Sequence, residues 1–216
     1  CDGWSINILI EALAALYRAR QNGQAVRLDT ALSFAAYATG LAPGANADPA
    51  TEAYWLKGFA IVPDMPDYPV DRPHPEYKTY AGGTRTGHVD ADTHKRLKKA
   101  GGKAGATLFS TLLGAMQVML SRLSGAEDIV IAIPSAGQSL LADAGVLAGH
   151  CVNLLPVRQS VHNGERFETH LKATQETVLK AFEHQAYTYG TLVRKLGIKR
   201  DPRRLPLTEF QFNLER

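Results

Sequence analysis

The sequence predicts an α/β fold, because amphipathic helical segments alternate with apolar runs that need cover on both faces. The run 127–134 (EDIVIAIP) ends in six apolar residues, several of them β-branched, which is typical of a strand buried on both faces. The segment 6–20 instead carries its apolar residues at helical spacing. Five prolines between 61 and 76 exclude a regular helix or a central strand there.

The helical pattern recurs along the whole chain. Helices are expected at 6–20, 29–39, 49–58, 92–103, 108–123, 165–185 and 189–196. Ser5 is the expected N-cap of the first helix and Thr107 that of the fifth, since a side-chain hydroxyl can accept from the open N–H groups of a first turn. His170 is expected on a helix surface.

Strands are expected at 127–134, 151–161 and 207–214. Two short segments, 77–81 and 84–89, flank Gly82-Gly83 and predict a β-hairpin. A loop is expected at Pro43-Gly44. The proline-rich segment 61–76 is the best candidate for a strap between two lobes, because proline stiffens the chain and favours extended structure.

Composition sets limits on the function. The chain has 216 residues, of which 45% are apolar and 21% charged. A chain of this size can bury a hydrophobic core without disulfides or metals to stabilise it. Its net charge of +3 comes from 24 basic and 21 acidic residues, a balance that gives no support for nucleic-acid binding. No apolar run approaches the roughly 20 residues that span a membrane. The chain has only two cysteines, Cys1 and Cys151, and they do not have the spacing of a zinc site. No signal peptide is visible, so a cytoplasmic location is expected.

Five short motifs follow one another along the chain. Asp2 and Gly3 open the run DGWS, and Tyr54-Trp55 lies on a predicted helix. The apolar strand ends in PSAGQ, which contains Ser135. The fourth motif is GHCVNLLPVR at 149–158, which contains His150 and Asn153. The fifth begins with HQAYTY from His184 and is completed by RDPRRLPL, which starts at Arg200 and Asp201.

In this order the motifs resemble those of condensation domains of nonribosomal peptide synthetases. DGWS resembles the end of the His-His-x-x-x-Asp-Gly signature, whose histidines would lie just before Cys1. The run 149–158 resembles Gly-x-Phe-Val-Asn-Thr-Leu-x-x-Arg, and Gln138 stands where the family's Ala-Gly-Arg turn has arginine. The resemblance covers essentially the whole chain.

The resemblance implies a chloramphenicol acetyltransferase-like two-layer α/β sandwich, mostly its C-terminal lobe. On this basis residues 1–60 end the N-terminal lobe, 61–76 form the interlobe strap and 77–216 form an incomplete C-terminal lobe. The implied reaction joins a donor acyl or peptidyl thioester to an acceptor aminoacyl thioester as an amide. The implied partners are donor and acceptor peptidyl carrier proteins and an adjacent adenylation domain. No cofactor is bound directly, and substrates arrive on 4′-phosphopantetheine.

The resemblance also assigns residue roles. The catalytic histidine is expected outside this chain, so the 216 residues alone are predicted to be inactive. Asp2 is expected to be a structural carboxylate paired with an arginine upstream, and Gly3 to let the backbone approach the substrates. Asn153 either ties two backbone segments together or, with Ser135 and His150, lines the substrate channel. Structural roles are expected for Ser5, Tyr54, Trp55, His184, Arg200 and Asp201.

Two functions of other kinds stay open. One is a non-catalytic lobe that only docks a carrier protein. The other is a coenzyme A-dependent acyltransferase of the same superfamily. Among close relatives, the run DGWSIN fits condensation better than epimerization domains, while cyclization domains differ at positions before Cys1. The HCVN variant at 150–153 favours a less typical condensation subtype.

Overall fold

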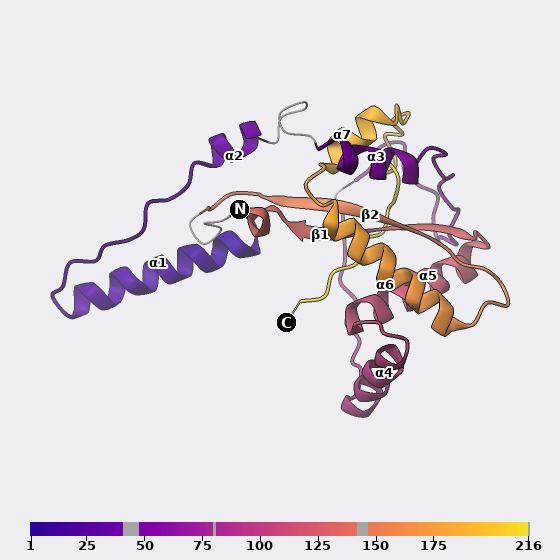
Figure 1. The fold of residues 1–216 in the computed structure, drawn as a ribbon, viewed down its shortest axis with the longest axis horizontal. Coiled ribbons are helices and arrows are strands. Elements are labelled where there is room, and N and C mark those ends of the chain that lie inside the picture. The colour runs from indigo at the N-terminus through magenta and orange to yellow at the C-terminus, as the bar shows by residue number, and fades with distance from the viewer. Residues whose placement is uncertain (41–47, 80, 142–146, 216) are drawn as a thin grey trace.

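A two-stranded antiparallel sheet lies at the centre of the computed structural model (Figure 1), which describes residues 1–40, 48–79, 81–141 and 147–215. Strand β1 (Asp128–Ala136) pairs with β2 (Val152–Ser160) along its full length, from Asp128 opposite Ser160 to Ala136 opposite Val152. The five residues 129–133 of β1 are all buried, as the β-branched run predicts.

Every expected helix is present; the one predicted at 49–58 has the predicted bounds, and the others have shifted ends. The helices are α1 (Gly3–Gln21), α2 (Phe34–Gly40), α3 (Pro49–Gly58), α4 (Ala91–Lys103), α5 (Leu108–Ser124), α6 (Phe167–Glu183) and α7 (Tyr189–Lys195), with a 3₁₀ turn, η1 (Gly137–Leu140), after β1. Helices α5 and α6 pack against each other and against the sheet. The α/β fold class is therefore confirmed.

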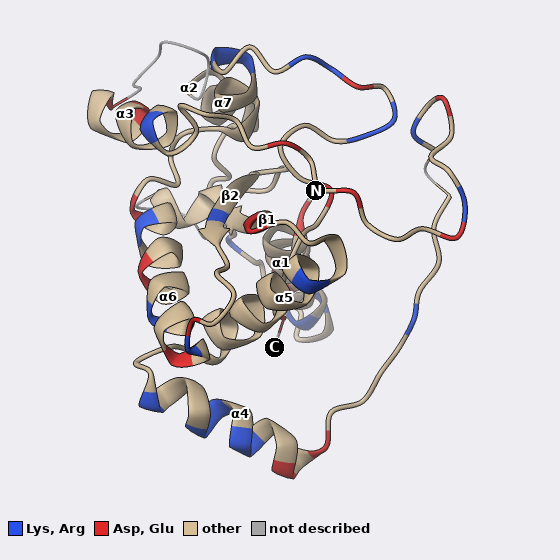
Figure 2. Ribbon diagram, turned by 90° about the vertical axis from the view of Figure 1, so that its right-hand side faces the viewer, with Lys and Arg blue, Asp and Glu red and all other residues tan. Residues whose placement is uncertain are grey.

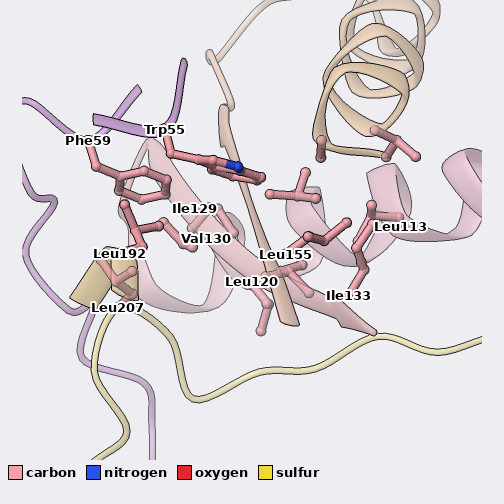
Figure 3. Packing of buried hydrophobic residues seen from close by; sticks show 14 of the residues in the cluster. Trp55, Phe59, Leu113, Leu120, Ile129, Val130, Ile133, Leu155, Leu192 and Leu207 are labelled. Carbon is pink, nitrogen blue, oxygen red and sulfur yellow. The ribbon is translucent and has the colours of Figure 1, made fainter. Parts of the chain in front are cut away.

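The core is formed where α3, α5, α6 and α7 meet the two strands (Figure 3). Ile129, Ile131 and Ile133 of β1 and Leu155 of β2 are 0 or 1% exposed. Burial of each such side chain contributes about 1.5–3 kcal/mol relative to exposure. Trp55 and Phe59 extend this cluster from α3, so the helix before the proline-rich segment packs on the helices and strands that follow it.

Helix α1 projects away from this body (Figure 1). The expected N-cap, Ser5, is wrong: the carboxylate of Asp2 accepts from the Ser5 N–H and starts the helix three residues earlier. A carboxylate has two acceptor oxygens for the first turn, which makes aspartate at least as good a cap as serine. The apolar face of α1 is exposed, from 46% at Leu16 to 67% at Leu13.

Helix α2 begins at Phe34, not at 29 as expected. The Ser33 hydroxyl accepts from the Ala36 N–H at 3.2 Å and caps the first turn. Residues 29–32 are exposed and contribute no buried surface that would extend the helix. The loop predicted at 43–46 lies outside the described residues.

Helix α4 is a polar surface helix, as predicted, and Lys and Arg residues recur along it (Figure 2). Thr107 caps α5 as predicted, since its hydroxyl accepts from the Ser110 N–H at 3.1 Å. Gly125, with φ 74°, ends α5 in the left-handed conformation that favours glycine.

The hairpin predicted around Gly82-Gly83 is wrong for the residues that the structure describes. Residues 77–79 and 81–89 form no strand and are exposed, and Tyr80 lies outside the description. A two-stranded hairpin without a face to bury is marginal in water. Residues 61–76 form neither helix nor strand, as their prolines predict. The division into lobes at this segment stays a prediction.

The strand predicted at 207–214 is reduced to a single bridge, in which Gln211 lies beside Ala132 of β1 in parallel orientation. Its ladder stops there because the Thr208 hydroxyl, not a backbone N–H, donates to the Val130 carbonyl at 2.6 Å. Leu207 precedes it with a positive φ of 65°, which turns the chain away from extended geometry.

His170 was expected on a surface but is 3% exposed, between α5 and α6. Its ring lies against Gly114 of α5: a Cβ added to Gly114 would be 3.5 Å from His170 Cδ2. The helical pattern misses this because an imidazole at a core position looks like a polar residue on the outer face.

Within the described ranges, no single helix is both long and apolar enough to cross a membrane. Only α4 and α5 taken together meet the length and composition criteria, and they are bent by 94°.

Candidate functional site

The carboxylate of Asp2 joins the first turn of α1 to the segments that follow β1 and precede β2. Gln138 Nε2 donates to it at 3.2 Å (Oδ1) and 2.9 Å (Oδ2). The Cys151 N–H donates to Oδ2 at 3.0 Å, and the Ser5 N–H to Oδ1 at 2.9 Å. Asp2 therefore fixes α1 against the turn that follows β1 and the residue that precedes β2.

Hydrogen bonding decides the ionisation of Asp2. Burial alone would raise its pKa, but donors on Gln138, on Ser5 and on the Cys151 backbone outweigh it and hold the pKa well below its usual range. The carboxylate is therefore ionised at neutral pH, and both oxygens are occupied by donors. Such a group is a poor proton acceptor, so Asp2 is suited to holding the backbone in place.

The predicted partner of Asp2, an arginine upstream, would lie before Cys1, so that pairing stays a prediction. Among the residues that the structure describes, Asp2 is held by Gln138, a fully buried amide at the position where the resembled motif has arginine. Gln138 Oε1 is buried and has no hydrogen-bond partner among the residues that the structure describes. The sequence shows Gln138 only as a departure from a motif, because the two residues lie 136 positions apart and meet only in the fold.

Ser5 bridges α1 to the segment before β2. Its Oγ accepts from the Gly149 N–H at 2.9 Å and lies 2.7 Å from both Gly149 O and Asp2 Oδ1, either of which can accept its one proton. Gly3 is exposed, and an added Cβ there would meet no atom within 4 Å. The close approach of Gly3 to a substrate stays a prediction.

Two aromatic side chains of α2 pack on the glycines of two motifs. A Cβ added to Gly149 would lie 2.1 Å from Phe34 Cδ2, and one added to Gly137 would lie 2.0 Å from the Tyr37 hydroxyl oxygen. Either clash would displace α2, so these positions require glycine. The sequence gives no local signal for this docking, since the glycines lie about 100 residues after α2.

A cavity of about 300 Å³ lies where α2, the start of β2 and the α6–α7 turn meet. Tyr37 and Cys151 form one wall, and His150 and Asn153 also border it. Two of the three predicted channel residues therefore share this cavity. The third, Ser135, is 4% exposed and is not among the residues that border it.

Asn153 lies in β2 and holds the α6–α7 turn. Its Nδ2 donates to the carbonyls of Gln185 and Tyr187 at 3.0 and 2.9 Å, and its Oδ1 accepts from the Tyr189 N–H at 3.0 Å. Asn153 thus ties two backbone segments together while one side of it borders the cavity. The Ser135 hydroxyl donates to Gln185 Oε1, which fixes the same turn from β1.

The Tyr54-Trp55 pair and His184 form one cluster, although their motifs lie about 130 residues apart. The Tyr54 ring stacks on His184 at 4.1 Å between centroids, and Trp55 Nε1 donates to the His184 carbonyl at 2.9 Å. The Thr51 hydroxyl lies 3.0 Å from His184 Nδ1. These contacts anchor α3 to the end of α6.

Arg200 and Asp201 lie away from Asp2, beside a second, open hollow of about 1210 Å³ between α7 and residues 62–67. Asp201 binds Arg203 through a pair of hydrogen bonds at 3.0 and 2.8 Å. These bonds lower the pKa of Asp201 to about 2. The side-chain bonds of Asp201 are therefore made within the RDPRRLPL motif, and Arg200 is exposed.

The thiol of Cys151 is neutral at physiological pH. Burial raises its pKa, and the charge of Asp2 raises it further. Burial likewise raises the pKa of Tyr37, with a further contribution from Cys151. Both cysteines are free: Cys151 is buried and Cys1 is exposed. Neither Tyr37 nor Cys151 was predicted from the sequence to border a cavity, because the two meet only in the folded chain.

Known proteins match this chain over its whole length. The condensation domain family model matches residues 1–216. One plipastatin synthase polypeptide of Bacillus subtilis (strain 168) is 36% identical over 214 residues, which are 99% of this chain and 8% of that protein. Tyrocidine synthase 2 of Brevibacillus parabrevis is 35% identical over 214 residues, 99% of this chain and 6% of that protein. The chain thus spans less than a tenth of these relatives.

Solved structures give the same fold. The X-domain from teicoplanin biosynthesis superposes with a TM-score of 0.85 at 26% identity, over 97% of this chain and 48% of that one. The first condensation domain of the calcium-dependent antibiotic synthetase superposes with a TM-score of 0.67 at 24% identity, over 91% of this chain and 43% of that one. The chloramphenicol acetyltransferase-like fold is thereby confirmed. From the family match and these relatives, the chain belongs to the condensation domain family.

Proposed function

We propose that this chain forms part of a domain that joins two carrier-bound thioesters through an amide bond. The observation that carries the proposal is the set of hydrogen bonds at Asp2, which fixes the first turn of α1 against the ends of β1 and β2 beside the 300 Å³ cavity. Such a network gives the segment just before Asp2 one position relative to that cavity. The domain division at 61–76 and the cytoplasmic location belong to the same proposal.

The reaction makes modest chemical demands. The amine nitrogen of the acceptor attacks the donor thioester carbonyl, a C–N bond forms, and the C–S bond breaks. The amine loses a proton and the departing phosphopantetheine thiolate takes one up, so atoms and charge balance. Because a thioester is already activated, most of the acceleration comes from holding the two arms together. A positioned imidazole of the expected His-His pair would handle the proton.

Within this scheme the chain's own residues support the chemistry. Asp2 holds the backbone and takes no proton, because its carboxylate is ionised and occupied by donors. Asn153 and Ser135 fix the α6–α7 turn that borders the cavity. The partners are donor and acceptor carrier proteins and an adenylation domain, and substrates arrive on 4′-phosphopantetheine without a further cofactor.

A turnover assay tests the proposal. Two loaded carrier proteins are supplied to the parent synthetase and, separately, to the 216-residue chain, and amide product is measured by mass spectrometry. We expect product from the parent and none above background from the chain alone. The surface variant Lys99→Ala of the parent serves as a control and should match wild type. Product from the chain alone would show that the histidine assignment is wrong.

A second candidate function is a non-catalytic docking module. The observation in its favour is the likeness to the X-domain from teicoplanin biosynthesis. In its solved complex with OxyB, that domain superposes on this chain with a TM-score of 0.84 at 26% identity. If the parent synthetase retains carrier-protein binding but makes no amide, docking is the better account. Transfer from coenzyme A thioesters in the same assay would instead favour the acyltransferase function.

A further inference from the structure

We propose that the 300 Å³ cavity beside Cys151 receives the side chain of one of the two thioester-bound groups and selects an uncharged side chain of limited size. This inference rests on the proposed amide-forming function and deepens it by naming the substrate class. Cys151 and Tyr37 are its specificity-determining residues.

The first step is the chemistry of the walls. Leu140, Val152 and Leu154 supply apolar surface, and the Cys151 thiol and the Tyr37 hydroxyl both stay neutral. Among the bordering residues that the structure describes, none is Lys, Arg, Asp or Glu. The Asp2 carboxylate lies behind Cys151, and both of its oxygens already accept hydrogen bonds from the protein. A charged side chain would therefore lose its water in the cavity without gaining a free counter-charge, which is costly.

The second step is the size of the cavity. About 300 Å³ is at the lower limit for pockets that bind small molecules, so it suits one side chain and not a whole peptidyl group. Cys151 is small, and the run that 149–158 resembles has phenylalanine at this position. A larger residue at 151 can therefore be accommodated by the fold but would occupy cavity space.

The third step is rigidity. The Cys151 N–H is bonded to Asp2, and Tyr37 is pressed against Gly137, where an added Cβ would lie 2.0 Å from its hydroxyl. Asn153, across the start of β2, uses both its nitrogen and its oxygen in hydrogen bonds to the α6–α7 turn. Walls fixed in this way discriminate by size because they cannot move aside without breaking these contacts.

The fourth step is position. Cys151 both borders the cavity and binds Asp2, so the cavity lies one hydrogen bond away from the turn that the expected catalytic segment precedes. A side chain held here would set the location of its own thioester or amine near that segment. Selection in this cavity should therefore appear in the rate of amide formation.

The first experiment uses the wild-type parent synthetase under single-turnover conditions. Norleucyl and lysyl thioesters, which have equal chain length and differ by one ammonium group, are loaded in turn on the acceptor carrier and then on the donor carrier. We expect norleucyl to react at least tenfold faster than lysyl on one of the two arms. Equal rates on both arms would overturn the inference.

The second experiment changes the wall. In Cys151→Phe the leucyl-to-alanyl rate ratio should fall at least tenfold on the same arm, since even a single methylene of mismatch in an apolar pocket changes rates by about 10–200-fold. Cys151→Ala should raise the phenylalanyl-to-alanyl ratio on that arm. The control Val89→Phe adds a phenyl group at an exposed site far from the cavity and should leave both ratios unchanged.

The outcomes separate the two proposals. In one outcome, the wild type forms alanyl amide and neither Cys151 variant alters the rate ratios. That result would overturn the cavity inference and leave the proposed function standing. No amide from any wild-type substrate pair would overturn both. If Cys151→Phe melts more than a few degrees below wild type, the Cys151→Ala ratios decide.

Discussion

Helices α1 and α5 have similar sequence patterns and opposite surroundings. Each is more than four turns long and carries apolar residues at helical spacing. In α5, Leu113 is 0% and Leu120 is 2% exposed, because α6 and the sheet cover that face. In α1, Leu13 is 67% exposed, and the helix is held mainly at its first turn through Asp2 and Ser5.

This contrast shows that an amphipathic pattern predicts a helix but not its neighbour. The face of α1 has no cover from the residues that the structure describes, although a contiguous apolar stripe of this kind usually marks an interaction surface. Stability in this chain should therefore come almost wholly from the α3–α7 body, while α1 contributes through its polar anchor.

The largest expected effect is in α5. Leu113→Ala should lower the free energy of unfolding by about 2–5 kcal/mol, because it leaves a cavity in a side-chain layer that cannot fully close. Denaturant unfolding followed by circular dichroism measures it. A loss below about 1 kcal/mol would mean that the body is looser than its packing indicates.

The Asp2 anchor comes next. In this chain Asp2→Asn should cost about 1–3 kcal/mol, the penalty for buried donors left without an acceptor, because the donors that the structure describes, led by Gln138, are all uncharged. Its folded-state pKa is lowered, so the stability it contributes is present above about pH 4 and lost as the pH falls below about 3.8.

Hydrogen exchange locates this effect. We expect Asp2→Asn to speed exchange in the first turns of α1 and to leave β1 and α5 protected. Uniform loss of protection across both regions would contradict an anchor that acts locally.

A smaller effect concerns pH and the α5–α6 interface. Burial lowers the pKa of His170, with a partly opposing contribution from Glu165, so the unfolded chain takes up a proton that the folded chain refuses. Stability should therefore fall as the pH drops below about 6.5, the ordinary pKa of histidine. His170→Gln should flatten this slope, whereas the exposed control His94→Gln should keep it.

The smallest effect is expected on the exposed face of α1. Leu13→Ala should change the free energy of unfolding by no more than about 0.5 kcal/mol, because the side chain is already in water. A loss comparable to that of Leu113→Ala would show that α1 has a covered face in solution, for example in a second copy of the chain.

Much of the local structure could be predicted from the sequence. The buried strand 127–134, the helix capped by Thr107 and the irregular proline-rich segment follow from periodicity, capping and proline geometry, which act within a few residues. The hairpin at Gly82-Gly83 and the strand at 207–214 failed because pairing needs a partner surface that local sequence does not specify.

The candidate site divides in the same way. Motif order placed Asp2, His150 and Asn153 in functional segments, and the structure brings the latter two to one cavity with Asp2 bonded beside it. The partner of Asp2 and the wall of Tyr37 and Cys151 could not be foreseen. Both contacts join residues more than a hundred positions apart, and a local sequence pattern does not predict contacts over that separation.

The helices, the buried strand and the family resemblance are all encoded locally, because they depend on spacing and residue type within short windows. Folding settles which amphipathic face is covered, that an amide holds Asp2, and that His170 is buried. These outcomes depend on long-range packing, in which each side chain's burial and ionisation are set by neighbours that meet it only when the chain folds.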